Sequence, residues 1–298
     1  MLIYTIIVTY NGCRWVDFCL GSLRKSSIQT IPLVIDNCST DTTVAYIREQ
    51  YPETLLFPQE KNLGFGQANN VGFHYALTHN ADYVLLLNQD AAIAPNTIEL
   101  MLTQSDGHSL LSPIHLNGKG DKIDHNFRQN TLFHSPVVID DLVAKGQLEP
   151  HYEIGEVCAA CWLLPISIVQ RIGGFNPLFA QYGEDNNYYQ RLCYHHIRIL
   201  LVPTARAYHD RKIQGNMKAY KKRILYRQLL LNATNINLNA LQCLYEQFAV
   251  LYRCYTYSLI HGEYIIGTYL CAILGLFIRT KQIIYSRKIE KQIQQTWL

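Results

Sequence analysis

Residues 83–91 read YVLLLNQDA, an apolar run that ends abruptly in three polar residues. The segment from Tyr83 to Leu87 does not alternate apolar and polar side chains, which is typical of a strand buried on both faces. Comparable runs occur at residues 3–9 and 31–36, and segments with a helical period separate the three. The pattern therefore predicts an α/β domain in which a mostly parallel sheet lies between helices.

Further elements follow from the same periodicities on either side of this strand. We expect additional strands at residues 55–58, 156–164 and 197–202, and helices at residues 14–27, 40–50, 66–78 and 184–195. Residues 117–155 show little periodicity and contain Gly118, Gly120 and Gly146 with several Asp and His, which indicates a long loop or insertion over the sheet. From about residue 216 the chain is expected to be helical to its end.

The charge distribution divides the chain in two. Of the 298 residues, 49% are apolar and 16% charged, which excludes intrinsic disorder as the main state. The net charge of +3 is the sum of −6 over residues 1–211 and +9 over residues 212–298. We therefore expect a globular domain over 1–211 and a basic helical extension over 212–298 that meets an anionic surface.

The cysteines and the N-terminus bear on where the protein is expected to work. The nine cysteines lack the regular spacing of a disulfide scaffold or a four-cysteine zinc site. The N-terminus begins with an apolar run that fits a strand better than a signal peptide. These observations favour a reducing, cytoplasmic location.

Polar residues stand where three of the expected parallel strands end. Because parallel strands end at one edge of a sheet, these side chains are expected to line a single site. They are Thr9, Tyr10 and Asn11 after the first strand, Asp36 and Asn37 at the end of the second, and Asn88, Gln89 and Asp90 after residues 83–87.

Six segments in order resemble the family 2 glycosyltransferases, inverting enzymes of the GT-A fold, and most closely their bacterial rhamnosyltransferase-like members. The segments are VTYNG (8–12), IDNCSTD (35–41), NLGFGQANNVG (62–72), LLLNQDA (85–91), GGF (173–175) and YGEDNNYYQR (182–191). The resemblance covers about residues 1–211. It implies transfer of a sugar, hexosyl or rhamnosyl, from a UDP or dTDP donor to a lipid-linked or polysaccharide acceptor in cell-surface glycan synthesis.

The resemblance also implies a divalent metal, Mg²⁺ or Mn²⁺, at the diphosphate of the donor. Asp90 is the last carboxylate of the segment that is similar to the family's D-x-D motif, whose first position here holds Asn88. His209 stands where the family has a histidine that completes the metal site. Oxygen ligands suit both metals, which stabilise charge developing on phosphate oxygens.

The remaining site residues are assigned by the same resemblance. Asp185 is expected to be the general base that takes the acceptor's proton, with Glu184 and Trp162 beside the acceptor; a place for Trp162 in the core is an equal alternative. Arg191 is expected to pair with Glu184 or Asp185. The nucleotide is expected to contact Thr9, Tyr10, Asn11, Asp36, Asn37, Asp41, Asn62, Gly64, Asn70 and Asn88.

The basic extension leaves two partners open. Residues 264–278 form an apolar run of 15 residues with basic residues after it, shorter than the roughly 20 that a membrane span needs. Shallow attachment to an anionic membrane surface is one interpretation, and packing on the first domain or on a second copy, as a homodimer, is the other. No recognition motif accompanies the basic residues, so nucleic acid is not an expected partner.

Two other functions compete with glycosyl transfer. A nucleotidyltransferase is expected to carry a glycine-rich, basic loop after its first strand, and that loop is missing. A non-catalytic or degenerate protein that binds nucleotide sugars stays open, because Asn88 and Asn187 both stand where the family has carboxylates.

Overall fold

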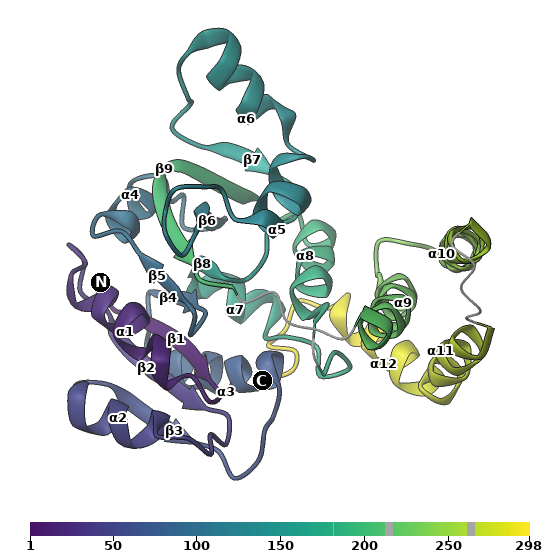
Figure 1. Ribbon diagram of the computed structural model, residues 1–298, viewed down its shortest axis with the longest axis horizontal. Helices are drawn as coiled ribbons and strands as arrows, with labels where there is room; N and C mark the ends of the chain where they lie inside the picture. Colours follow the sequence, from purple (N-terminus) through teal and green to yellow (C-terminus); the bar gives the residue numbers. More distant parts are fainter. Residues whose placement is uncertain (181, 212–216, 261–265) are drawn as a thin grey trace.

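The computed structural model describes residues 1–180, 182–211, 217–260 and 266–298 (Figure 1). Its strands are β1 (Ile3–Thr9), β2 (Ile31–Asp36), β3 (Leu55–Pro58), β4 (Tyr83–Leu87), β5 (Ala91–Ile93), β6 (Leu110–Asn117), β7 (Tyr152–Ile154), β8 (Cys161–Pro165) and β9 (Ile199–His209). Its main helices are α1 (Val16–Arg24), α2 (Thr43–Gln50), α3 (Phe65–Thr78), α4 (Thr97–Thr103), α7 (Ile166–Ile172), α8 (Glu184–Tyr194), α9 (Met217–Thr234), α10 (Ala240–Ile260), α11 (Ile266–Ile278) and α12 (Thr280–Glu290).

The strands form one mixed sheet in the order β3-β2-β1-β4-β8-β6-β9-β5, with β7 paired to β9. The first four strands of this order are parallel, as the apolar runs predict. Beyond β4 the sheet turns mixed, because β8 is antiparallel to both β4 and β6. The carboxyl ends of β1, β2 and β4 therefore lie along one edge.

Helices cover both faces of the sheet, which explains why its strands lack polar alternation. On one face Ile6 and Leu86 pack with side chains of α3, α7 and α8, such as Phe73. On the other face Ile7 and Leu85 pack with side chains of α1, α2 and α4. The expected three-layer α/β architecture is confirmed.

The structure adds elements that the sequence pattern does not predict. Strand β5 has only three residues, too few to show a period, and α4 and β6 follow it. The segment 117–155, expected to be a loop, contains short helical pieces, among them α5 (His125–Phe127), η2 (Arg128–Leu132), α6 (Pro136–Asp140) and η3 (Asp141–Lys145). With β7 it forms an arm that stands out from the sheet at the top of Figure 1.

The helices α9 to α12 stand to one side of the sheet, as Figure 1 shows in green and yellow. After α12 the chain returns to the first domain, where the amide of Gly174 donates to the carbonyl oxygen of Thr296 at 2.8 Å. Among the described residues, no helix is long and apolar enough to cross a membrane.

Candidate active site

Hydrogen bonds between side chains and backbone tie the ends of β1, β2 and β4 together. The hydroxyl of Thr9 donates to Asp36 Oδ1 at 2.8 Å. The amide of Tyr10 donates to Gln89 Oε1 at 2.9 Å. The polar residues at these strand ends therefore lie together, as their positions on parallel strands predict.

Two loops form the wall beside Asp36. Asp36 is buried and also accepts hydrogen bonds from the amide and hydroxyl of Ser39, at 2.9 and 2.6 Å. Asn11, held at a left-handed φ of 47°, accepts from the amide of Thr40 at 2.8 Å. Asp41 accepts a hydrogen bond from the amide of Thr43 at 3.0 Å. Burial tends to raise the pKa of Asp41, but its hydrogen bonds with Thr43 and with the amide of Cys13 outweigh this effect and hold the pKa below its ordinary value. The carboxylates of this wall are fixed by short-range contacts.

The loop before α3, residues 59–64, forms a second wall of the candidate site. Asn37 Oδ1 accepts from the amide of Leu63 at 2.6 Å, and Asn62 Oδ1 accepts from the amide of Gly64 at 2.9 Å. Gly64 has a φ of +79°, and a Cβ atom there would lie 2.5 Å from the carbonyl oxygen of Ala180. Only glycine fits this close approach.

Asn70 has a different role from the expected contact with the nucleotide. Its amide nitrogen donates to the carbonyl oxygens of Phe175 and Trp297, at 2.8 and 3.1 Å, and its Oδ1 accepts from the amide of Phe175 at 2.6 Å. Both polar atoms of this buried side chain are used, so Asn70 joins α3 to the chain before α8. The nucleotide contact expected of Asn70 stays a prediction, beside this role in the fold.

A histidine and a carboxylate meet where β5 pairs with β9. Ala91 lies opposite His209 in this antiparallel pair, which places the preceding Asp90 next to the histidine. His209 Nε2 lies 3.1 Å from Asp90 Oδ1 and 3.5 Å from Asn88 Nδ2. His209 is buried, whereas the Asp90 side chain is 22% exposed. Three residues assigned to the donor and its metal are thus brought together.

The chemistry of this group fits a divalent cation. A carboxylate oxygen and an imidazole nitrogen in contact are typical ligands, and a cation would take the place of the proton between them. Asn88 Oδ1 and His209 Nδ1 are buried without a hydrogen-bond partner, so the amide oxygen has free capacity. Within the described part of the chain no cluster of three or more His, Cys, Asp or Glu residues could hold a metal. Further ligands would therefore come from Asn88, from water or from the donor itself.

A group of three carboxylates lies at the start of α8. Burial, reinforced by the negative charge of Asp185, raises the pKa of Glu184 to about 8 and that of Glu156 to about 7. Burial also raises the pKa of Asp185, against hydrogen bonds from the amides of Asn186 and Ala159 and the charge of Arg227. Asn186 donates to Glu156. Sequence reasoning missed Glu156 and Arg227, which belong to no motif and join the group only through the fold.

A short turn connects the carboxylates to the histidine pair. The amide of Ala159 lowers the pKa of Asp185, and the carbonyl oxygen of the next residue, Ala160, accepts a hydrogen bond from the amide of Asn88 at 3.0 Å. Asp185 and Asn88, which lies beside His209, are therefore both close to residues 159–160. A sugar donor held at the strand ends would have an acid or base from α8 near its other side.

Two expected contacts are not found. Trp162 is fully buried in β8, with its ring stacked on Phe175 at a centroid distance of 6.3 Å. Of the two roles that the sequence allows, the structure shows packing in the core and not a wall for the acceptor. Arg191 lies 3.8 Å from Glu290 of α12, so its predicted pairing with Glu184 or Asp185 is wrong. Glu184 itself is buried and packs against Gly66 of α3.

Comparisons with known proteins agree with this arrangement. The family model described as "Glycosyl transferase family 2" matches residues 4–173. A crystal structure of residues 1–349 of S. aureus TarS in complex with UDP superposes with a TM-score of 0.58 and 18% identity, covering 88% of this chain and 74% of that fragment. The mannosyltransferase PcManGT from Pyrobaculum calidifontis, in complex with GDP-Man and Mn²⁺, superposes with a TM-score of 0.59 and 15% identity. This superposition covers 97% of this chain and 83% of the PcManGT chain. A search of curated proteins found no match.

Proposed function

The chain belongs to glycosyltransferase family 2 and has the GT-A fold, and from this premise we propose that it is a metal-dependent inverting glycosyltransferase. Its proposed donor is a UDP- or dTDP-sugar and its acceptor a lipid-linked or growing polysaccharide. The observation that carries the proposal is the contact of Asp90 and Asn88 with His209 at the strand ends, with Asp185 close to the same turn, residues 159–160. Similar proteins of this fold were solved with UDP or with GDP-Man and Mn²⁺, which supports a nucleotide-sugar donor.

The proposed donor site uses the contacts at the strand ends. Asp36 presents a buried carboxylate that can accept a hydrogen bond from a uracil or thymine N3–H. Asp90, His209 and Asn88 would hold a divalent cation, which stabilises the negative charge that develops on the departing diphosphate. The two loops around Asn11 and Asp41 hold the Asp36 carboxylate in place through Ser39, which donates to Asp36 and accepts from the amide of Asn11.

The proposed acceptor side uses Asp185. A general base must accept the proton of the acceptor hydroxyl as that oxygen attacks the anomeric carbon. Burial raises the pKa of Asp185, which makes the ionised carboxylate a stronger base than an exposed aspartate. Arg227 opposes this shift and helps to keep the carboxylate ionised. A single displacement of this kind inverts the configuration at the anomeric carbon.

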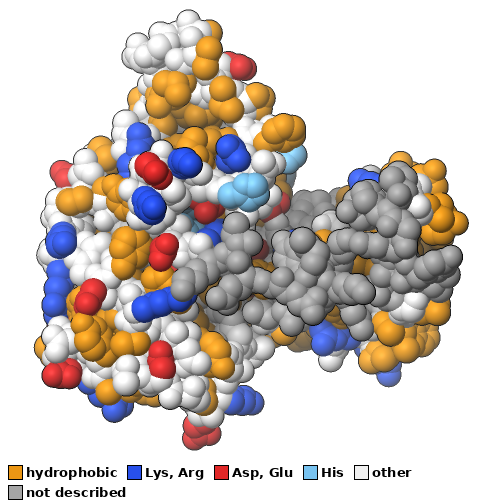
Figure 2. All heavy atoms as spheres, viewed as in Figure 1, with side chains coloured by type: hydrophobic (Ala, Val, Ile, Leu, Met, Phe, Trp, Pro, Cys, Tyr) orange, Lys and Arg blue, Asp and Glu red, His pale blue; other side chains and the backbone are white. Residues whose placement is uncertain are grey.

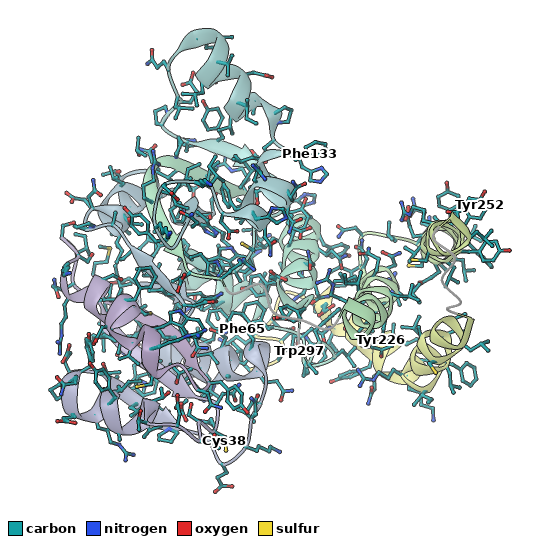
Figure 3. The ribbon with its side chains drawn as sticks, viewed as in Figure 1. Cys38, Phe65, Phe133, Tyr226, Tyr252 and Trp297 are labelled. Carbon is teal, nitrogen blue, oxygen red and sulfur yellow. The ribbon has the colours of Figure 1, made fainter. Side chains whose placement is uncertain are left out.

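The helices α10 and α11 support a membrane-bound acceptor. Large apolar side chains on both are exposed to solvent, and Figure 2 shows hydrophobic atoms gathered at that end of the molecule. They are Leu241, Leu244, Tyr245, Phe248, Tyr252, Tyr255, Leu259, Leu270, Ile273, Leu274, Phe277 and Ile278. Figure 3 shows Tyr252 pointing away from the rest of the chain.

The same helical extension carries exposed basic side chains. Arg253, Lys281, Lys288 and Lys291 are exposed. Lys218, Lys221, Lys222 and Arg223 fall outside the residues whose side chains are described. Exposed aromatic and basic residues together favour the boundary of an anionic leaflet, so we infer that the extension docks on the cytoplasmic membrane surface. Docking on a second copy of the chain is the competing outcome.

A donor screen tests the proposed function. Melting temperatures are measured with UDP-, dTDP- and GDP-sugars, each with and without Mn²⁺, and release of nucleotide is then followed for every donor that binds. A ligand at a hundredfold excess over its Kd stabilises the folded state by about 2.7 kcal/mol. We expect a metal-dependent shift for one nucleotide class and turnover of that donor. Binding without turnover, in the presence of membrane extract as acceptor source, would instead support the non-catalytic alternative.

A further inference from the structure

The last residues of the chain form a hook, Glu290–Leu298, that packs beside the candidate site. Thr296 accepts a hydrogen bond from Gly174 at 2.8 Å, and Trp297 accepts one from Asn70 at 3.1 Å. Leu298 packs against the core that contains α3 and α8. Figure 3 shows Trp297 between the first domain and the helices α9 and α12. The hook therefore contacts α3, through Asn70, and α8, through Arg191, and the first turns of both helices border the candidate active site.

The Gly173–Gly174 turn has no room for side chains because the hook occupies the space. Gly173 has a φ of +74°, and a Cβ atom at this position would lie 1.9 Å from the Thr296 carbonyl oxygen. A Cβ atom on Gly174 would lie 2.3 Å from Asn70 Oδ1 of α3 and 2.7 Å from a methyl carbon of Leu298 in the hook. The local sequence of the first domain thus fits the presence of the hook.

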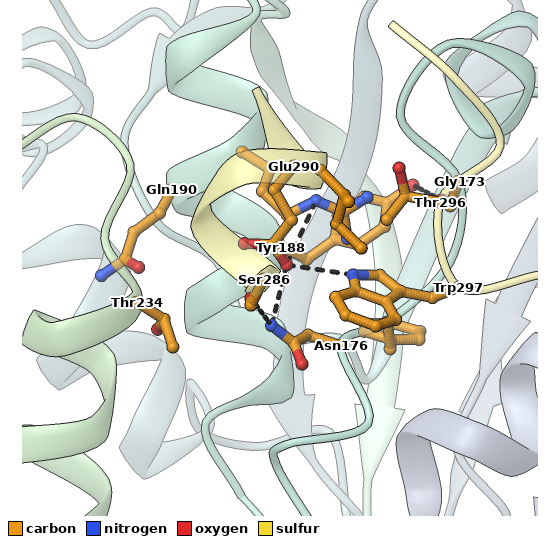
Figure 4. A network of polar contacts seen from close by, with 12 residues as sticks. Gly173, Asn176, Tyr188, Gln190, Thr234, Ser286, Glu290, Thr296 and Trp297 are labelled. Carbon is orange, nitrogen blue, oxygen red and sulfur yellow. Dashed lines mark hydrogen bonds and ion pairs between the residues drawn. The ribbon is translucent and has the colours of Figure 1, made fainter. Parts of the chain in front are cut away.

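A buried ion pair fastens the hook to α8 (Figure 4). Glu290 and Arg191 are each 1% exposed, and Glu290 Oε1 lies 3.8 Å from Arg191 Nε. The same carboxylate oxygen accepts hydrogen bonds from Asn176 Nδ2 at 2.8 Å and from Trp297 Nε1 at 3.1 Å, the dashed lines of Figure 4. Charges removed from water are tolerated only with such partners.

The environment of Glu290 also accounts for Asn187. This residue is buried on α8, and its amide, with Arg191 and the other donors, opposes the rise that burial causes in the pKa of Glu290. An aspartate at position 187 would place a second negative charge beside Glu290. The amide at this position therefore fits the carboxylate that the hook supplies.

Arg191 lies six residues after Asp185 on the same helix, which corresponds to about 9 Å along its axis. We propose that Glu290 and Trp297 are positioning residues, which hold α8 so that Asp185 faces the acceptor. This inference rests on the proposed function of Asp185. It makes the C-terminal hook a working part of the active site, since Glu290 and Trp297 would act on the reaction only through Arg191 and α8.

The test compares Glu290→Gln with Glu246→Gln, a matched change at a partly exposed acid of α10. Turnover and the donor KM are measured well below the melting temperature of each variant. We expect Glu290→Gln to lower kcat at least tenfold while the donor KM stays within twofold, and Glu246→Gln to match the wild type. A purely structural role would lower the melting temperature and leave kcat of the folded enzyme unchanged, which would overturn the proposal.

A second variant guards against simple unfolding. Trp297→Phe keeps the Arg191–Glu290 ion pair and an aromatic ring, but it removes the indole N–H that donates a hydrogen bond to Glu290. We expect a smaller loss in kcat with the donor KM again unchanged, and an increase in KM alone would contradict the positioning role.

Hydrogen exchange separates this inference from the proposed function. Amides in the first turn of α8 should exchange faster in Glu290→Gln than in the wild type, whether or not a donor for transfer is known. Unchanged exchange in that turn would refute the hook's effect on α8. Faster exchange in Glu290→Gln, together with a wild type that turns over no donor, would count against the proposed function alone.

Discussion

Replacing Asp185 with asparagine removes the proposed base with little change in shape. General-base catalysis contributes about 10²- to 10⁴-fold to a rate, so the barrier should rise by about 3–5 kcal/mol. The donor contacts at the strand ends do not include Asp185, so the donor Kd should stay within about twofold. We therefore expect transfer to fall at least a hundredfold in a variant that still binds donor and metal.

The stability of this variant follows from the same contacts. The carboxylate accepts a hydrogen bond from the amide of Asn186 at 2.9 Å, and an asparagine that no longer accepts it would lose about 1 kcal/mol. Against this loss, the amide removes a negative charge that raises the pKa of Glu156 and Glu184. The two effects have opposite signs, so the free energy of unfolding at pH 8 should change by no more than about 1 kcal/mol.

The assay follows product formation in single-turnover reactions with saturating donor and Mn²⁺. Asp140→Asn, the same change at an exposed acid on the arm, serves as the control and should behave as the wild type. Transfer within threefold of the wild type in Asp185→Asn would refute the assignment of the base. A large fall in donor affinity would show instead that Asp185 acts on the donor.

Three further predictions concern metal, pH and membrane. Asp90→Asn and His209→Ala should each abolish the Mn²⁺-dependent rise in melting temperature with donor and lower kcat/KM at least about a hundredfold, while His134→Ala on the arm should retain both. Glu184→Gln should unfold at higher denaturant than the wild type at pH 9 but not at pH 4.5. The raised pKa of Glu184 means that its contribution to stability is complete below its ordinary pKa of 4.5 and is lost as pH rises through about 8; equal midpoints at pH 9 would contradict this. Phe248→Glu should weaken co-sedimentation with anionic vesicles about thirtyfold, since burying a phenylalanine contributes about 2 kcal/mol. The control Phe133→Glu on the arm should bind vesicles as the wild type does. A fall in dimer content with unchanged vesicle binding would favour docking on a second copy of the chain instead.

The strands of the first domain were predictable because each is a short apolar run with clear ends. Residues 3–9, 31–36, 55–58 and 83–87 match β1 to β4 in full. Strands β5, β6 and β7 were not predicted, whereas β8 and β9 were predicted with different ends, 156–164 against Cys161–Pro165 and 197–202 against Ile199–His209. Local patterns thus determine the parallel half of the sheet better than the mixed half.

From strand positions alone, the sequence predicts contacts in the site only between residues at the ends of neighbouring parallel strands. Thr9 and Asp36 stand at the ends of the neighbouring strands β1 and β2, and parallel pairing is enough to bring them together. The amide of Asn70, by contrast, bonds to Phe175 and Trp297, which lie 105 and 227 residues away in the sequence. Because such contacts leave no local pattern, a sequence motif did not reveal that this amide serves the fold.

The two asparagines that replace family carboxylates differ in what they say about catalysis. Asn187 is buried on α8 and its amide lowers the pKa of Glu290, so an acid at position 187 would be repelled by the carboxylate of the hook, which gives the asparagine a structural reason. Asn88 retains a buried oxygen without a partner next to His209 and Asp90, where it can still serve a cation or a donor. The argument for a non-catalytic protein therefore depends on Asn88 alone. Asn88→Asp decides the matter: a variant with tighter Mn²⁺ binding but unchanged turnover would show that the asparagine is compatible with transfer, whereas turnover that appears only in this variant would show a site that had lost it.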